Sequence, residues 1–213
     1  YGRVAGEGEA DAGTWTKRYD GVACVVTVAH TQLRCQTAPG TGKGYAWRVN
    51  VGRQYSGVFT GVLTSYAPPV IINFQGLGAV DADTEGNELV RVEGRQFGTM
   101  AADAIDVVTY GKEGTEYTAD CHVSADHEEI TCLTAQGAGL ELKWRVVVDG
   151  QASVTPTTEY APPDINATTS SAPGVDVDAL LSDGGQAVTL LGDDFGPPQS
   201  YLDAEFGPGV TYL

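Results

Sequence analysis

Four cysteines form the clearest chemical pattern in the sequence. Cys24 and Cys35 lie eleven positions apart, and Cys121 and Cys132 repeat that spacing. A zinc site would need closer pairs such as Cys-x-x-Cys, or histidines at ligand spacing, and the three histidines of the chain do not supply them. The spacing therefore predicts one disulfide within each pair, and a protein that folds outside the reducing cytosol.

Paired carboxylates also recur along the chain. Asp81 and Asp83 follow one Pro-Pro segment, and Asp176 and Asp178 follow the next at a similar distance. Two carboxylates on one face of an extended segment are a candidate Ca²⁺ site that would stiffen a domain junction. The alternative is a solvated strand edge whose charge resists edge-to-edge pairing. An EF-hand is excluded because Val92 stands where that loop needs a bidentate Glu. No other cofactor is expected.

No residue pattern indicates catalysis. His30, His122 and His127 have no repeated or glycine-framed nucleophile as a partner, and no glycine-rich phosphate loop precedes a helix. We therefore expect the protein not to be an enzyme.

Asn166 begins an Asn-Ala-Thr sequon inside a polar segment rich in Ser and Thr. This pattern predicts an N-glycosylation site on an exposed entry loop of a secreted protein.

The composition excludes two classes of partner. The 213 residues carry a formal net charge of −16, which opposes binding to nucleic acid and docking on anionic lipid. The sequence contains no apolar run long enough to span a membrane. Abundant Gly, Thr and Val favour short strands and tight turns over helices.

A repeat organises the whole chain. Cys24, Cys35 and Trp47 each recur 97 positions later, at Cys121, Cys132 and Trp144. A Tyr-Ala-Pro-Pro segment closes each copy, at 66–69 and 160–163, and predicts a short, stiff joint. We expect the second half of a domain over 1–69, a complete domain over 70–163 and the first half of another over 164–213. Such ragged ends predict a piece of a longer array.

Alternating apolar residues predict the strands. The segment 45–51 places Tyr45, Trp47, Val49 and Val51 on one face, and Trp47 and Trp144 are the expected core residues. In the complete unit, the segments 88–94, 105–110 and 142–148 alternate or run apolar in the same way, and Asp149-Gly150 signals a hairpin. About seven short strands without helical periodicity are typical of a β-sandwich.

The ordered set of motifs resembles the IPT/TIG domains, an immunoglobulin-like family shared by plexins and certain transcription factors. The resemblance rests on the Tyr-Ala-Pro-Pro entries, on the Val-x-Val/Leu-x-Gly-x-x-Phe-Gly element at 90–98 and 188–196, and on the cysteine pair followed by Trp-x-Val-x-Val. It implies tandem immunoglobulin-like β-sandwiches, one complete and two partial, in an extracellular or cell-surface protein. The basic loops of the DNA-binding branch are missing from this acidic chain.

These observations favour a structural or adhesive segment of a secreted or cell-surface protein, part of an extracellular filament or assembly. Its expected partners are other copies of itself, or other extracellular proteins and glycans. The alternative is a receptor ectodomain or a module that binds glycans or proteins. That module would need an exposed aromatic platform or a concave cluster of loops in one domain, and Tyr55, Phe59, Tyr110 and Tyr117 are the candidates.

Overall fold

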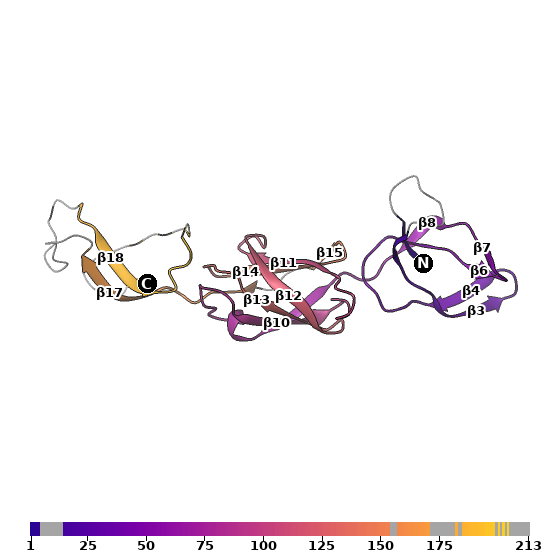
Figure 1. The fold of residues 1–213 in the computed structure, drawn as a ribbon, viewed down its shortest axis with the longest axis horizontal. Coiled ribbons are helices and arrows are strands. Elements are labelled where there is room, and N and C mark those ends of the chain that lie inside the picture. The colour runs from indigo at the N-terminus through magenta and orange to yellow at the C-terminus, as the bar shows by residue number, and fades with distance from the viewer. Residues whose placement is uncertain are drawn as a thin grey trace.

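The chain is built almost entirely from antiparallel β-strands. The computed structural model describes residues 1–4, 15–153, 157–170, 182, 185–198, 200, 202 and 204. Within this part of the chain the only helical element is a 3-10 turn, η1 (Leu77–Ala79). The all-β prediction is confirmed. The sheets fall into three units, which follow one another along the long axis of the molecule (Figure 1).

The middle unit is a closed sandwich. Its strands are β9 (Val70–Gln75), β10 (Leu89–Arg95), β11 (Ile105–Gly111), β12 (Tyr117–Ala125), β13 (Glu129–Leu133), β14 (Leu142–Val148), β15 (Gln151–Ala152) and β16 (Thr157–Thr158). They form one hydrogen-bonded path, β15-β14-β11-β12-β13-β10-β9, and β16 also pairs with β14.

Strand β12 folds this path into two layers. Its first part, Tyr117–Ala119, pairs with β11, whereas its second part, Asp120–Ala125, pairs with β13. One layer is therefore β9-β10-β13-β12 and the other is β12-β11-β14 with β15 and β16. This strand order is that of an immunoglobulin-like sandwich. The core between the layers includes Val90, Val92, Ile130 and Trp144, all fully buried.

The N-terminal unit contains β1 (Gly2–Val4), β2 (Trp15–Arg18), β3 (Val22–Val28), β4 (Gln32–Gln36), β5 (Tyr45–Trp47), β6 (Asn50–Val51), β7 (Gln54–Tyr55) and β8 (Phe59–Thr64). The sheet order β2-β1-β5-β8 corresponds to β12-β11-β14-β16 of the middle unit, and the β3–β4 hairpin corresponds to β12–β13. The hairpin registers agree: Val26 faces Leu33 just as Val123 faces Ile130, 97 positions later.

The predicted continuous strand over 45–51 is wrong. Strand β5 ends at Trp47, and β6 pairs instead with β7 in a small hairpin of its own. The turn residues Gly52 and Arg53 both have positive φ, at 57° and 69°, which suits a tight two-residue hairpin turn. Val49 and Val51 are consequently exposed.

The C-terminal unit is described as one hairpin, β17 (Asp164–Ser170) with β18 (Val188–Asp193). It follows the second Tyr-Ala-Pro-Pro segment, and Figure 1 shows it at the opposite end of the molecule from β3 and β4.

Candidate interaction site

The face of the β3–β4 hairpin that should be covered is open. Val26 is 63% exposed and Leu33 is 41% exposed, whereas their counterparts Val123 and Ile130 are 8% and 0% exposed. In the middle unit, β10 and β9 continue the same layer beyond the edge of β13 and help to enclose the core under this face. The described residues of the N-terminal unit contain no counterpart of those two strands.

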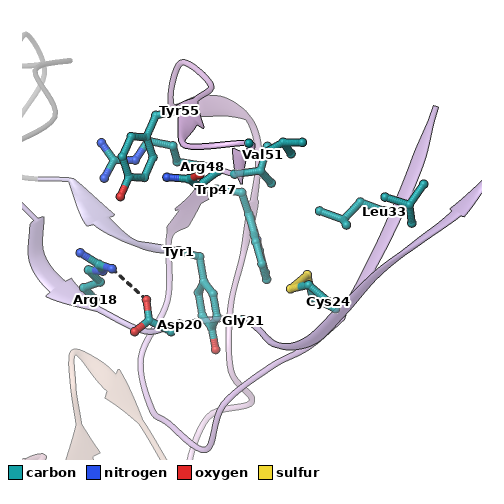
Figure 2. A pocket seen from close by; sticks show the side chains of 15 residues that line it. Tyr1, Arg18, Asp20, Gly21, Cys24, Leu33, Trp47, Arg48, Val51 and Tyr55 are labelled. Atoms are coloured by element: carbon teal, nitrogen blue, oxygen red, sulfur yellow. Dashed lines mark hydrogen bonds and ion pairs between the residues drawn. A yellow bond between two sulfur atoms is a disulfide. The ribbon is translucent and has the colours of Figure 1, made fainter. Parts of the chain in front are cut away.

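A cavity of about 540 Å³ lies under the open face. Figure 2 shows Leu33 and Cys24 of the hairpin on one side and Trp47 and Tyr1 on the other. We call the region lined by Tyr1, Val26, Leu33, Cys35 and Trp47 the open groove. Its lining combines apolar side chains with polar and charged ones, among them Asp20 and Asn50, which suits a surface with an apolar centre and a polar rim.

A ring stack and a hydrogen bond hold the floor of the open groove. The rings of Tyr1 and Trp47 stack at 4.3 Å, and Trp47 Nε1 donates to Thr64 Oγ1 at 3.0 Å. The middle unit has the same arrangement: Tyr110 and Trp144 stack at 4.4 Å, and Trp144 Nε1 donates to Thr158 Oγ1 at 2.6 Å. The groove is therefore a sandwich interior in which the layer of β3 and β4 contains two strands, where the matching layer of the middle unit contains four.

Polar groups stand at the rim of the groove. Arg18 donates to the Asp20 carboxylate at 2.9 Å, and the guanidinium of Arg48 lies 4.4 Å from the ring centre of Tyr55. All four residues line the cavity, and Figure 2 shows Tyr55 beside Arg48. Such a rim surrounds an apolar centre in many protein interfaces.

The groove also offers a free strand edge. Within the described residues, β4 pairs only with β3. In the middle unit the same edge of β13 pairs with β10, where Val90 faces Cys132 and Val92 faces Ile130. The outer edge of β4 can therefore accept a further antiparallel strand, because its N–H and C=O groups form a ready template.

Comparison of the chain with family models, curated proteins and solved structures found no match.

Both cysteine pairs form disulfides, Cys24–Cys35 and Cys121–Cys132. Each disulfide joins two neighbouring strands. Cys121 and Cys132 face each other across β12 and β13, and Cys24 and Cys35 lie on the paired strands β3 and β4. The described residues include no helix long and apolar enough to cross a membrane. The two disulfides are compatible with an extracellular or secreted protein.

The two predicted tryptophans differ in burial. Trp144 is fully buried in the core of the middle unit. Trp47 departs from the prediction of a core residue because its ring is only partly covered. The cause is the open groove, where a covering layer would otherwise lie over the ring.

The acidic pairs do not form a metal cluster in the described structure. Asp81 and Asp83 are exposed in an irregular segment before β10, where Asp81 has φ of 50°. The Asp83 carboxylate accepts the N–H of Glu85 at 2.8 Å. No group of three or more His, Cys, Asp or Glu is placed to hold a metal among the described residues. Asp176 and Asp178 lie outside them, so the Ca²⁺ site stays a prediction.

Asn166 is exposed, but it lies on β17 and not in the entry loop that the sequence suggests. Its side-chain amide donates to Asp193 on the neighbouring β18 at 2.6 Å. The polar Ser/Thr-rich composition gave the appearance of a loop, whereas pairing with the apolar β18 makes the segment a strand. Glycosylation of Asn166 remains a prediction.

The four candidate aromatics do not form one platform. Tyr55 and Phe59 are exposed on the N-terminal unit. Tyr110, in contrast, is fully buried, and Tyr117 is partly buried with its hydroxyl donating to the Ala138 carbonyl at 3.0 Å. Tyr110 is therefore excluded as a ligand-stacking residue, because it belongs to the core.

The sequence analysis missed a repeated network of tyrosine hydroxyls. In the middle unit, the Tyr110 and Tyr160 hydroxyls lie 2.5 Å apart, and Tyr160 donates to the Ala135 carbonyl at 2.9 Å. In the N-terminal unit, Tyr1, Tyr66 and Ala38 make the corresponding bonds. The tyrosine that begins each Tyr-Ala-Pro-Pro segment was the feature of the sequence that could have indicated this network.

The network keeps its hydroxyls neutral. Burial raises the pKa of Tyr160 far above its ordinary value, and the hydrogen bond with Tyr110 raises it further. Burial likewise raises the pKa of Tyr66, with help from Tyr1. These tyrosines anchor the end of each unit to the loop around 135–138 or its counterpart, and they supply no acid or base for catalysis near neutral pH.

Proposed function

We propose that this chain is a structural segment of a secreted or cell-surface repeat protein. Tandem immunoglobulin-like units, of the IPT/TIG type by resemblance, act in it as a stiff spacer within an extracellular filament or assembly. The observation that carries this proposal is a joint between units that is built in the same way twice.

Each joint brings a glycine against the same loop of the preceding unit. A Cβ on Gly98 would lie 3.2 Å from Thr41 Cγ2, and a Cβ on Gly196 would lie 2.9 Å from Ala138 Cβ. Gly196 follows Gly98 by 98 positions, and Ala138 follows Thr41 by 97. Both glycines also have positive φ, at 90° and 77°. Close approach and backbone conformation together favour glycine at both positions.

Polar contacts fasten the first joint. Lys17 Nζ lies 2.5 Å from Asp149 Oδ2, and Thr41 Oγ1 donates to the same oxygen at 3.1 Å. Burial alone would lower the pKa of Lys17, but its hydrogen bonds and charge interactions with Asp149 and Tyr19 together outweigh burial and raise that pKa. Gln151 adds a bond to the Tyr66 carbonyl at 3.1 Å. The middle unit is therefore held to the N-terminal unit through several side chains.

The second joint has its own polar clamp. The N–H and the hydroxyl of Thr84, a buried residue of the middle unit, both donate to Asp194 Oδ1 at 3.2 Å. At both joints the linker contains Pro-Pro, which fixes φ and removes two donors. Stiff linkers and side-chain clamps support a rod over a flexible string of domains.

Small-angle X-ray scattering of the 213-residue chain tests the proposal. We expect the profile of a rod, with one narrow cross-section and a maximum dimension several times larger. The variant Asp149→Ala removes the acceptor at the first joint and should shorten and broaden the distance distribution. Asp120→Ala, which removes the same charge from an exposed position on β12, serves as the matched control. A compact or freely flexible profile for the unaltered chain would contradict the proposal.

One observation favours the alternative of a binding module. Tyr55 is 65% exposed beside Arg48 at the rim of the open groove, a suitable surface for stacking a sugar ring. A glycan screen would support this function if one class of glycan bound and Tyr55→Ala abolished the binding. Phe59→Ala, at another exposed aromatic of the same unit, is the matched control.

A further inference from the structure

The turn between β14 and β15 is an Asp-Gly pair, Asp149 and Gly150. Such a pair can react spontaneously, because glycine has no side chain to shield its backbone nitrogen from the preceding carboxyl group. The nitrogen of Gly150 bonds to Cγ of Asp149, the N–H proton and the carboxyl hydroxyl leave as water, and a cyclic succinimide forms. Water then opens the ring at the former peptide bond, which leaves an isoaspartyl residue and an unchanged chain mass.

The folded structure holds both reacting groups away from each other. Lys17 Nζ lies 2.5 Å from Asp149 Oδ2, and Thr41 Oγ1 donates to the same oxygen at 3.1 Å. The N–H of Gly150 donates to Asp106 Oδ2 at 2.7 Å. Asp149 and Gly150 also have positive φ, at 52° and 75°, as a two-residue hairpin turn requires. The carboxyl group and the nitrogen are therefore both engaged elsewhere while the first joint is closed.

A second Asp-Gly pair, Asp20 and Gly21, lies between β2 and β3 and is far more exposed. The side chain of Asp20 is 82% exposed, whereas that of Asp149 is 14% exposed. Asp20 pairs with Arg18, which is itself 59% exposed, and solvent screens such a surface pair. The chain therefore contains its own reference for an Asp-Gly pair outside the joint.

Isomerisation at Asp149 would break the first joint at two points. The isoaspartyl residue adds one carbon to the main chain and places its carboxylate on Cα, away from Lys17 and Thr41. The added carbon also lengthens the turn that positions Gln151, whose amide donates to the Tyr66 carbonyl at 3.1 Å across the joint. One covalent change thus removes the ion pair and displaces a second contact.

We propose that Asp149-Gly150 is a site of spontaneous isomerisation that the first joint controls. A closed joint protects the pair, an opened joint exposes it, and the modified turn then prevents the joint from closing again. The site thereby converts a transient local opening into a permanent one. This inference rests on the proposed function, because it requires a joint that is closed in the intact rod.

Ageing of the 213-residue chain tests the proposal. The protein is held at neutral pH and body temperature for several weeks and then digested. The aspartyl and isoaspartyl forms of each peptide are separated by chromatography and identified by electron-transfer mass spectrometry. We expect isoaspartate to accumulate at Asp20 well before it does at Asp149. Equal rates at the two pairs would overturn the proposal.

Opening the joint by substitution should abolish the protection. Lys17→Met removes the cation that holds the carboxylate and should raise the rate at Asp149 roughly tenfold, since loss of a charged hydrogen bond shifts an opening equilibrium by about that factor. The rate at Asp20 should change little. Lys143→Met is the matched control, because Lys143 lies 3.8 Å from Glu113 and takes no part in the clamp at the first joint.

A second variant leaves the N-terminal unit unaltered. Asp106→Ala removes the acceptor of the Gly150 N–H and should also raise the rate at Asp149. An unchanged rate at Asp149 in either variant, or an equal rise in the lysine control, would overturn the proposal. Circular dichroism before ageing establishes that each variant is folded.

Scattering of the modified chain separates this inference from the proposed function. The form with isoaspartate at position 149 is purified by ion exchange, and we expect it to scatter as a more flexible particle than the fresh chain. A rod profile from both forms would overturn the inference and leave the proposed spacer standing. A flexible profile from the fresh chain would contradict the proposed function instead.

Discussion

The middle and N-terminal units share a frame but differ in how far it is covered. Each has a disulfide between neighbouring strands, a tryptophan stacked on a tyrosine and a pair of tyrosine hydroxyls bonded to a loop carbonyl. Among the described residues, only the middle unit has two further strands, β10 and β9, beside the hairpin that carries the disulfide. These shared contacts are therefore made by the strands from β11 onward and by their counterparts. Full burial of the core additionally needs β9 and β10.

This difference has an energetic consequence. Full burial of one valine or leucine side chain stabilises a protein by about 1.5–3 kcal/mol. Val22, Val26 and Leu33 are all exposed, while their counterparts Ala119, Val123 and Ile130 are buried. Covering the open groove is therefore worth several such contributions, and substitutions should have unequal effects in the two units.

The largest difference is expected for the tryptophans. Trp144→Ala leaves a large cavity in a closed core and should lower the unfolding free energy of the middle unit by about 3–5 kcal/mol. Trp47→Ala removes a partly covered ring and should cost less than about 2 kcal/mol. Urea titrations followed by circular dichroism measure both. Equal losses would mean that the N-terminal unit has a closed core in solution.

The next largest difference is expected in how easily the two disulfides are reduced. Cys132 is fully buried, whereas Cys24 is exposed on a hairpin that pairs with no further strand among the described residues. Mild reductant under native conditions should therefore open Cys24–Cys35 first, because thiol exchange needs access to a sulfur. Alkylation and mass spectrometry identify the reduced pair. Replacing Cys121 and Cys132 together by Ala should cost the middle unit about 2–4 kcal/mol.

Simultaneous reduction of the two pairs would contradict this expectation. A useful control is the reaction in denaturant, where the two bonds are equally accessible and should be reduced at similar rates.

The tyrosine network should give the smallest effect. Tyr160→Phe removes one hydroxyl bond and should cost about 1 kcal/mol at neutral pH. Because the folded-state pKa of Tyr160 is raised, the unfolded chain loses this proton first as pH rises above about 10. Stability is therefore fully present at neutral pH and falls in alkali. Denaturant midpoints between pH 8 and 11 should fall less steeply for Tyr160→Phe than for the unaltered chain.

Tyr55→Phe is the matched control, since Tyr55 is exposed and its hydroxyl takes no part in the network. An alkaline loss of stability that is the same in both variants and in the unaltered chain would contradict the assigned role of Tyr160.

The sequence predicted what local spacing determines. Cys24, Cys35 and their repeats mark adjacent strands, and Asp149-Gly150 marks a hairpin that the structure contains. Alternation failed over 45–51, because it registers which residues are apolar and not which strand each segment pairs with: β5 pairs with β8, whereas β6 pairs with β7.

Contacts between residues far apart in the sequence could not be predicted in this way. Tyr110 looked available for a ligand because nothing near it in the sequence indicates Tyr160, which lies 50 positions away and bonds its hydroxyl. The open groove was also missed. A groove arises when strands that should cover a face are not there, and composition does not record which face that is.

The glycines at the two joints determine a geometry larger than one unit. Gly98 and Gly196 meet the same loop of the preceding unit, and a contact that repeats in this way along an array relates successive units by a recurring screw step. In an extended array such a step sets a helical pitch, and equivalent surfaces recur at regular angles around the axis. A bulky residue at one of these glycines would therefore shift the azimuth of every unit beyond it.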